Sequence, residues 1–136
     1  MSLDAQGAWT AIYTPFDASG AVDQEALEAL CERQASAGVG IVACGTTGET
    51  PTLTSEEVEQ VIVTAVRVAS GRVPVIAGTG SNSTRTTLIQ TRRARELGAN
   101  GALVVTPYYN KPSVLGQLAH FEAVADEGGL PVMLYN

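Results

Sequence analysis

Residues 40–69 read GIVACGTTGETPTLTSEEVEQVIVTAVRVA, an apolar run followed by a polar loop and then by a helical pattern. The run 40–44 is continuously apolar, which is typical of a strand buried on both faces of a parallel sheet. The apolar residues of 58–69 recur at helical spacing and predict one buried stripe. Thr54 and Glu57 have the spacing of a capping box at the start of that helix. The stretch therefore predicts one strand–loop–helix unit.

The same unit recurs along the chain. Apolar runs predict five strands, at 8–13, 40–44, 73–77, 102–105 and 131–135. Helical patterns lie around 27–35, 54–69, 83–97 and 113–126, and three of them stop at glycine, which suits a left-handed helix cap. Alternating strands and helices predict an α/β fold with a parallel sheet. Two architectures fit: an open doubly wound sheet, or part of a closed (β/α)₈ barrel, which takes about 250 residues when complete.

Composition and charge exclude several classes of partner. The 136 residues are 45% hydrophobic and only 5% aromatic, so the core must consist mainly of aliphatic side chains. A net charge of -6 and a pI near 4.6 argue against nucleic acid and anionic membranes as partners. No apolar run approaches the ~18 residues of a membrane span. Residues 1–4 lack the pattern of a secretion signal, so we expect a cytoplasmic protein.

The loops that follow the predicted strands carry hydroxyl groups and few charges. The loop Gly45–Thr50 offers backbone N–H groups and adjacent threonine hydroxyls, which suit a small carboxylate. A tight turn without a ligand is the alternative. The loop lacks the lysine of a P-loop, and Gly78–Ser83 lacks the third glycine of a dinucleotide fingerprint. No cluster of His, Cys and Asp predicts a metal site.

Three of the four tyrosines follow predicted strands at the same edge of the sheet. They are Tyr108, Tyr109 and Tyr135, and a tyrosine hydroxyl that is hydrogen-bonded to threonine can relay a proton. Tyrosines also commonly pack at such an edge. The single histidine, His120, lies in the middle of a predicted helix, where we expect a surface or helix-packing role. Cys31 and Cys44 are expected to be core residues.

Four stretches together resemble one known family. They are Gly45–Glu49, Val75–Gly80, Val105–Ser113 and Leu134–Asn136, and they match the dihydrodipicolinate synthase/N-acetylneuraminate lyase family of class I aldolases in order and spacing. The similarity covers the chain from Trp9 onward. The paired threonines 46 and 47 resemble the synthase branch more than the lyase branch, which usually has Ser-Thr at this place.

The resemblance implies a (β/α)₈ barrel that condenses pyruvate with aspartate semialdehyde in lysine biosynthesis. The chain would be the N-terminal half of the barrel: a single partial domain, residues 1–136, of about five parallel strands and four helices that ends after strand five. Pyruvate would form a Schiff base with a lysine, so no separate cofactor is expected. Members are commonly dimers or tetramers, so we expect a homo-oligomer.

The resemblance also assigns roles to residues of this chain. Thr46, Thr47 and Gly48 would bind the pyruvate carboxylate. Tyr135 would pass protons, coupled through Thr46 to Tyr109, and in the family that last tyrosine typically comes from the partner across a tight dimer interface. Thr46, Tyr109 and Tyr135 are thus the expected catalytic residues.

Several departures from the family pattern limit what the chain can do. In the family the Schiff-base lysine follows the sixth strand, beyond residue 136, and the only lysine here is Lys111. The arginine that helps to bind the second substrate is also absent. Asn82 and Tyr108 match a site through which lysine inhibits some members. However, three neighbouring positions carry Ser55, Val58 and Thr86 in place of the His, His and Glu that are frequent in sensitive members.

Three hypotheses follow from these observations. The first is that the intact protein is a synthase and that these 136 residues alone are inactive. The second is a sibling pyruvate aldolase, such as a sugar-acid aldolase or N-acetylneuraminate lyase. The third is a non-catalytic half-barrel that associates with itself, because five parallel strands leave two unpaired edges.

Overall fold

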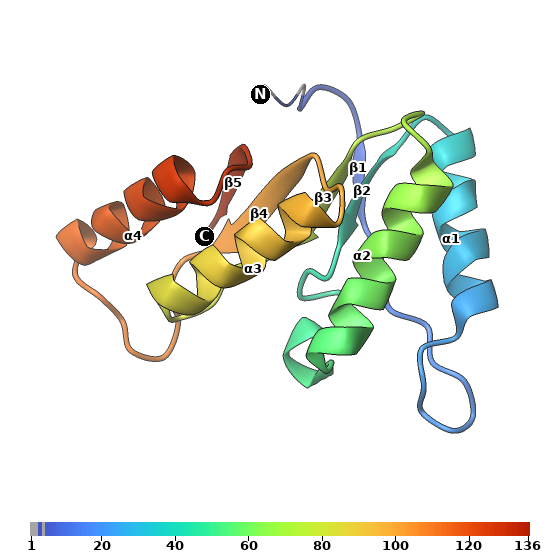
Figure 1. The fold of residues 1–136 in the computed structure, drawn as a ribbon, viewed down its shortest axis with the longest axis horizontal. Helices are drawn as coiled ribbons and strands as arrows, with labels where there is room; N and C mark the ends of the chain where they lie inside the picture. The colour runs from blue at the N-terminus through green and yellow to red at the C-terminus, as the bar shows by residue number, and fades with distance from the viewer. Residues whose placement is uncertain (1–2, 4) are drawn as a thin grey trace.

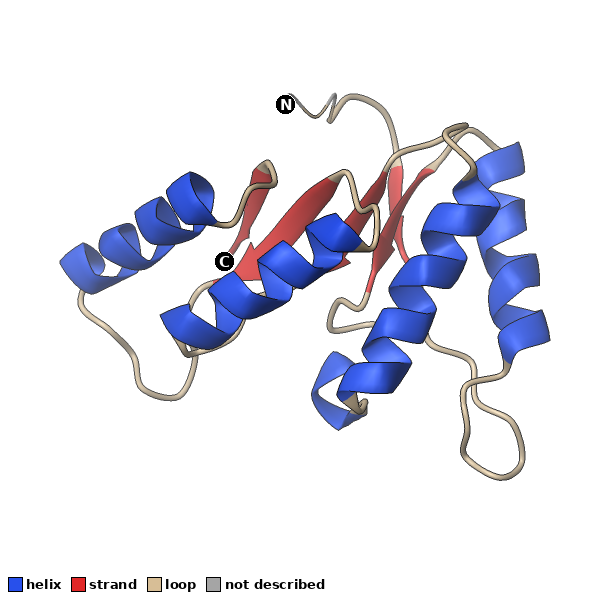
Figure 2. Cartoon of the chain, viewed as in Figure 1, coloured by secondary structure: helices blue, strands red, loops and turns tan. Residues whose placement is uncertain are grey.

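All five strands of the computed structural model lie in one parallel sheet (Figures 1 and 2). The structure describes residue 3 and residues 5–136. Residues 1, 2 and 4, on which the expected absence of a secretion signal partly rests, lie outside the described residues. The strands are β1 (Trp9–Ala11), β2 (Gly40–Ala43), β3 (Val75–Gly78), β4 (Gly101–Val105) and β5 (Val132–Tyr135). The helices are α1 (Gln24–Ser36), α2 (Ser55–Ala69), α3 (Thr84–Glu96) and α4 (Val114–Glu127), with a 3₁₀ turn, η1 (Thr50–Thr52).

The order of the strands decides between the two architectures that the sequence left open. Neighbouring strands follow chain order, β1-β2-β3-β4-β5, with no reversal of the kind that marks a doubly wound sheet. The four α-helices cover one face of the sheet, as Figure 2 shows. Sequential parallel strands with helices outside them are the pattern of a (β/α)₈ barrel. The predicted half-barrel of five strands and four helices is confirmed.

The helix boundaries follow from the local sequence. At the start of α2, the Thr54 hydroxyl accepts from the Glu57 N–H, and the Glu57 carboxylate accepts from the Thr54 N–H, which is the predicted capping box. Gly38 and Gly98, just beyond α1 and α3, have φ of +69° and +95°. Glycine adopts this left-handed conformation without a steric cost, so both helices end where the sequence predicts.

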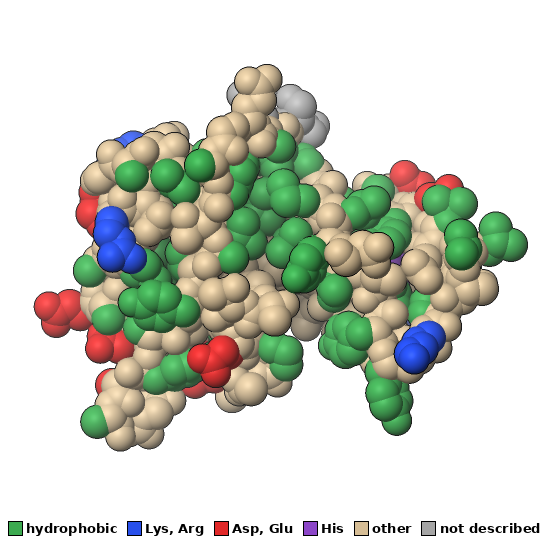
Figure 3. Space-filling model, turned by 180° about the vertical axis from the view of Figure 1, so that it is seen from behind, with side chains coloured by type: hydrophobic (Ala, Val, Ile, Leu, Met, Phe, Trp, Pro, Cys, Tyr) green, Lys and Arg blue, Asp and Glu red, His purple; other side chains and the backbone are tan. Residues whose placement is uncertain are grey.

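The two faces of the sheet carry different sets of apolar side chains. Ile41, Val75 and Val104 point toward the helices and belong to the main aliphatic core, together with Leu27 of α1 and Val61 of α2. Alternate residues of the same strands, such as Val42 and Leu103, point to the opposite face. Figure 3 shows that face from behind, with apolar side chains gathered over the sheet. Cys31 and Cys44 are buried and free, which confirms their place in the core.

Exposed ion pairs join neighbouring helices. Arg93 of α3 contacts Glu59 of α2 at 2.7 Å, and Arg92 of α3 contacts Glu127 at the end of α4 at 3.1 Å. Such pairs contribute about 0–1 kcal/mol each, because solvent screens them. They do, however, neutralise two of the four arginines on α3. No helix within the described residues is long and apolar enough to cross a membrane.

His120 packs between α3 and α4. Its side chain is 4% exposed, and its Nδ1 lies 2.9 Å from the Thr84 Oγ1. Its Nε2 is buried and has no hydrogen-bond partner among the described residues. Burial lowers the pKa of His120 below its ordinary value of 6.5, because a charged imidazole here would lose its hydration. The helix-packing role expected for His120 is confirmed.

This burial makes the stability of the fold depend on pH. Below pH 6.5 the unfolded chain binds a proton on His120 that the folded chain does not accept. The free energy of unfolding should therefore be constant just above pH 6.5 and fall as the pH drops toward the lowered pKa, by at most about 1.4 kcal/mol per pH unit. Urea unfolding at pH 7.5 and pH 5.5 measures the loss. His120 is the only histidine of the chain, so His120→Leu should remove most of this loss of stability at low pH. An unchanged pH dependence in that variant would show that His120 does not cause the loss.

Candidate active site

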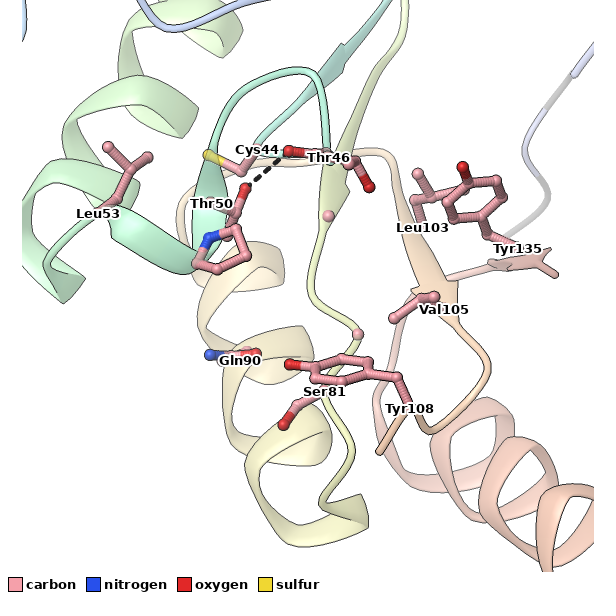
Figure 4. A pocket seen from close by; sticks show the side chains of 14 residues that line it. Cys44, Thr46, Thr50, Leu53, Ser81, Gln90, Leu103, Val105, Tyr108 and Tyr135 are labelled. Carbon is pink, nitrogen blue, oxygen red and sulfur yellow. Dashed lines mark hydrogen bonds between the residues drawn. The ribbon is translucent and has the colours of Figure 1, made fainter. Parts of the chain in front are cut away.

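A cavity of about 500 Å³ lies at the carboxyl ends of the strands (Figure 4). Its wall combines Gly45 and Thr46 after β2, Gly78 at the end of β3, Val105 of β4 and Tyr135 of β5. Four consecutive strands thus deliver residues to one place, which is where barrel enzymes keep their active sites. The edge of the sheet that the sequence predicts to be functional therefore contains a cavity.

A sharp turn at Cys44 brings the loop over the cavity. The sequence predicts Cys44 as the last residue of the strand, but β2 ends at Ala43 and Cys44 has a φ of +55°. That left-handed conformation is uncommon for a residue with a side chain. It directs the Cys44 carbonyl at Gly78, where a Cβ atom would lie only 2.0 Å from the carbonyl oxygen. A glycine is therefore required at the end of β3.

Hydrogen bonds within the loop fix its shape. The Gly48 N–H donates to the Gly45 carbonyl, and the Glu49 N–H donates to the Thr46 carbonyl, both at 3.1 Å. The Thr50 hydroxyl also donates to the Gly45 carbonyl at 3.1 Å, which is the dashed line in Figure 4. Two overlapping turns therefore follow β2 and lead into η1, a 3₁₀ turn that the sequence analysis did not predict.

Thr46 and Thr47 keep free donors at the tip of this loop. Both residues are exposed, and within the described residues neither the hydroxyl nor the N–H of either one has a hydrogen-bond partner. Thr46 lines the cavity, whereas Thr47, the next residue in the loop, does not. Gly48 is buried beneath them and does not line the cavity. The loop thus presents unpaired hydroxyl and N–H groups suited to an oxyanion, with Gly48 as part of the support.

Thr14, in the segment after β1, supports the loop. Its hydroxyl donates to the Gly48 carbonyl at 2.7 Å, and its side chain is buried. Thr14 directly follows the predicted first strand, 8–13, and the sequence predicts no role for it. A threonine that directly precedes a proline at the end of a strand was the only available signal, and it does not reveal a partner 34 residues away.

The tyrosines are placed differently from one another. Tyr135 ends β5 and lines the cavity on the same side as Thr46, and Tyr108 lines it beside Ser81 and Gln90 (Figure 4). Tyr109 does not line it: the side chain is 91% exposed, and its φ is +69°. Within this chain the structure therefore brings Tyr135 to the site of Thr46, while Tyr109 points into solvent.

The remaining predicted residues lie around the cavity. The Asn82 carbonyl accepts from the Asn110 side chain at 2.9 Å, which ties the loops after β3 and β4 together. The role of Asn82 and Tyr108 in inhibition stays a prediction. Lys111 is exposed in the loop before α4, with a φ of +42°, and does not line the cavity.

The cavity wall is electrically neutral. None of its described residues carries a charge at neutral pH, and burial raises the pKa of the Cys44 thiol to about 12. No group of three or more His, Cys, Asp and Glu that could hold a metal ion occurs among the described residues. A small carboxylate in the cavity would meet hydroxyl and N–H donors and no competing anion.

The fold and the cavity define the class: sequential strands of a (β/α) barrel with a loop of free hydroxyl and N–H donors at their carboxyl ends. The model of the dihydrodipicolinate synthetase family matches residues 4–136. The chain belongs to this family.

Individual relatives agree with the family match. The 4-hydroxy-tetrahydrodipicolinate synthase of Exiguobacterium sibiricum is 54% identical over 132 residues, which is 96% of this chain and 45% of the relative. A crystal structure of dihydrodipicolinate synthase from Bacillus anthracis has a TM-score of 0.94 at 46% identity and covers 99% of this chain and 47% of that one. The Acinetobacter baumannii enzyme, chloride-inhibited and complexed with pyruvate, has a TM-score of 0.93 at 51% identity and covers 96% and 45%. The chain thus spans about half the length of the relatives it matches.

Proposed function

We propose that the protein carrying this chain is a 4-hydroxy-tetrahydrodipicolinate synthase, which condenses pyruvate with aspartate semialdehyde. One observation carries the proposal: Thr46 and Thr47 have unpartnered donors at the tip of one loop, and Thr46 lines a neutral cavity formed by four barrel strands. A relative that is 51% identical is complexed with pyruvate, whose carboxylate has the size and charge that these donors suit.

The residues of this chain would bind pyruvate and move protons. The carboxylate rests on the hydroxyl and N–H groups of Thr46 and Thr47. A lysine amine from outside this chain then adds to the pyruvate carbonyl carbon, and loss of water gives the imine. Tyr135, at the same cavity, carries protons to and from the reacting oxygen, and its hydroxyl is coupled to Thr46. The covalent imine replaces any separate cofactor.

A second copy of the chain would supply Tyr109. This tyrosine is 91% exposed and precedes in the chain a group of exposed apolar side chains at the start of α4: Val114 at 80%, Leu115 at 77% and Leu118 at 52%. Apolar surface of this kind favours association. We therefore propose a homo-oligomer, a dimer or tetramer, in which Tyr109 of one copy approaches Thr46 of the other. The two free cysteines fit a cytoplasmic location, where thiols stay reduced.

The proposal is tested on the intact barrel, in which this chain is joined to the remaining strands. With pyruvate and aspartate semialdehyde as substrates, we expect condensation that depends on both. Sugar-acid aldehydes and N-acetylmannosamine should be poor replacements for aspartate semialdehyde. Activity with a sugar-acid aldehyde alone would instead identify a sibling aldolase, and no activity with any aldehyde would favour a non-catalytic, self-associating barrel.

A further inference from the structure

Two side chains from outside the loop 45–50 hydrogen-bond to it within the part of the chain that the structure describes. Thr52, in the adjoining 3₁₀ turn, donates to the Glu49 carbonyl at 2.9 Å. Thr14, from a distant part of the chain, donates to the Gly48 carbonyl. The bond is short, at 2.7 Å, and buried, because Thr14 is only 3% exposed. The backbone that carries Thr14 is itself held, since the Pro15 carbonyl accepts from the Asp23 N–H at 2.9 Å. The donor therefore stands on fixed structure and not on a mobile segment.

We propose that Thr14 is a positioning residue that aims the Thr47 N–H at the bound carboxylate. The inference rests on the proposed function. Its basis is that a trans peptide group is planar, with its C=O and N–H pointing in opposite directions. Whatever fixes the carbonyl of such a group also fixes the direction of its N–H.

Two peptide groups connect Thr14 to Thr47. The Thr14 hydroxyl holds the Gly48 carbonyl, and the same peptide group contains the Glu49 N–H. That N–H donates to the Thr46 carbonyl at 3.1 Å, and the peptide group of this carbonyl contains the Thr47 N–H. The orientation of the Thr47 N–H is therefore set by a continuous sequence of hydrogen bonds that begins at Thr14.

A parallel arrangement holds the other donor. The Gly45 carbonyl shares a peptide group with the Thr46 N–H, and it accepts from the Thr50 hydroxyl and the Gly48 N–H. Thr50 lies within the loop, so it cannot fix the loop relative to the rest of the barrel. Thr14 can, because it belongs to the segment after β1. Thr14 thus sets both the direction of one donor and the position of the whole loop at the cavity.

Thr14→Val in the intact barrel enzyme tests the proposal, because it keeps the shape of the side chain and removes the donor. We expect the KM for pyruvate to rise about tenfold, which is the effect of one buried hydrogen bond. The KM for aspartate semialdehyde should change less than about twofold, because that substrate does not use the Thr47 N–H. Thr14→Ser keeps the hydroxyl and should restore the pyruvate KM to near that of the unsubstituted enzyme.

Thr64→Val is the matched control. Thr64 is equally buried, and its hydroxyl lies 3.0 Å from the Gln24 side chain at the α1–α2 interface, away from the cavity. This variant should lower the melting temperature and leave the pyruvate KM unchanged. If Thr14→Val does not fold, Thr14→Ala removes the same donor without placing a methyl group against the Gly48 carbonyl, and the same rise is expected.

The outcomes separate this inference from the proposed function. If the unsubstituted enzyme does not condense pyruvate with aspartate semialdehyde, the proposed function fails. If it does, and the Thr14 variants without a hydroxyl keep the normal pyruvate KM, the positioning role is refuted. An equal rise in the Thr14→Val and Thr64→Val variants would likewise refute it, since the effect would then come from loss of stability.

Discussion

Thr46→Val in the intact barrel enzyme should lower kcat/KM by about 10³-fold, because the substitution removes a group with two functions. The Thr46 hydroxyl is a free donor at the cavity, where we propose that it binds the carboxylate and connects to Tyr135. Valine has nearly the same shape, so packing is preserved. Since Thr46 is exposed, the free energy of unfolding should change by no more than about 0.5 kcal/mol.

Thr46→Ser is the control for this prediction. Serine keeps the hydroxyl and loses only a methyl group, so kcat/KM should stay within about tenfold of the unsubstituted value. Steady-state kinetics with varied pyruvate, together with a melting curve for each variant, measures both effects. A Thr46→Val enzyme that retains full kcat/KM would show that the Thr46 hydroxyl does not participate in the reaction.

Gly78→Ala should destabilise the fold by about 3 kcal/mol or more. The added Cβ would lie 2.0 Å from the Cys44 carbonyl oxygen, so backbone meets backbone and no side-chain rotation can relieve the contact. β2 and β3 would have to separate at the edge that carries the cavity. The expected fall in melting temperature is about 10 °C for a domain of this size.

Gly45→Ala is the matched comparison, because it adds the same methyl group to the neighbouring loop. A Cβ at Gly45 would meet only Val42 and Leu103, at 3.9 and 4.0 Å, which are ordinary contacts. Thermal unfolding of both variants should show a large loss for Gly78→Ala and a small one for Gly45→Ala. Equal stability of the two variants would contradict the account of the turn at Cys44.

The sequence predicts elements best where a local signal is strong. The capping box at Thr54 and the glycine at Gly38 place helix ends to within a residue, because each end depends on contacts within one turn of the helix. The sequence predicts the ends of strands less accurately than the ends of helices. The run 73–77 begins two residues before β3, since nothing in an apolar run shows where pairing with the neighbouring strand starts.

The features of the site that the sequence does not reveal depend on interactions between distant parts of the chain. The turn at Cys44 depends on the space that Gly78 leaves, and the support of Gly48 depends on Thr14. Neither dependence has a local pattern. Thr46 and Tyr135, which the resemblance names together, line one cavity in the structure, and their roles in catalysis stay a prediction. The expected coupling to Tyr109 requires a second copy of the chain, because within one copy that side chain points into solvent.

The central claim is that this chain holds the pyruvate-binding loop but not the nucleophile. Borohydride reduction in the presence of pyruvate, followed by mass spectrometry, tests it most directly. The intact barrel should show one pyruvate adduct on a lysine outside these 136 residues, and the isolated chain, whose only lysine is Lys111, should show none. Lys111 is exposed and does not line the cavity. A specific adduct on Lys111 would contradict the account.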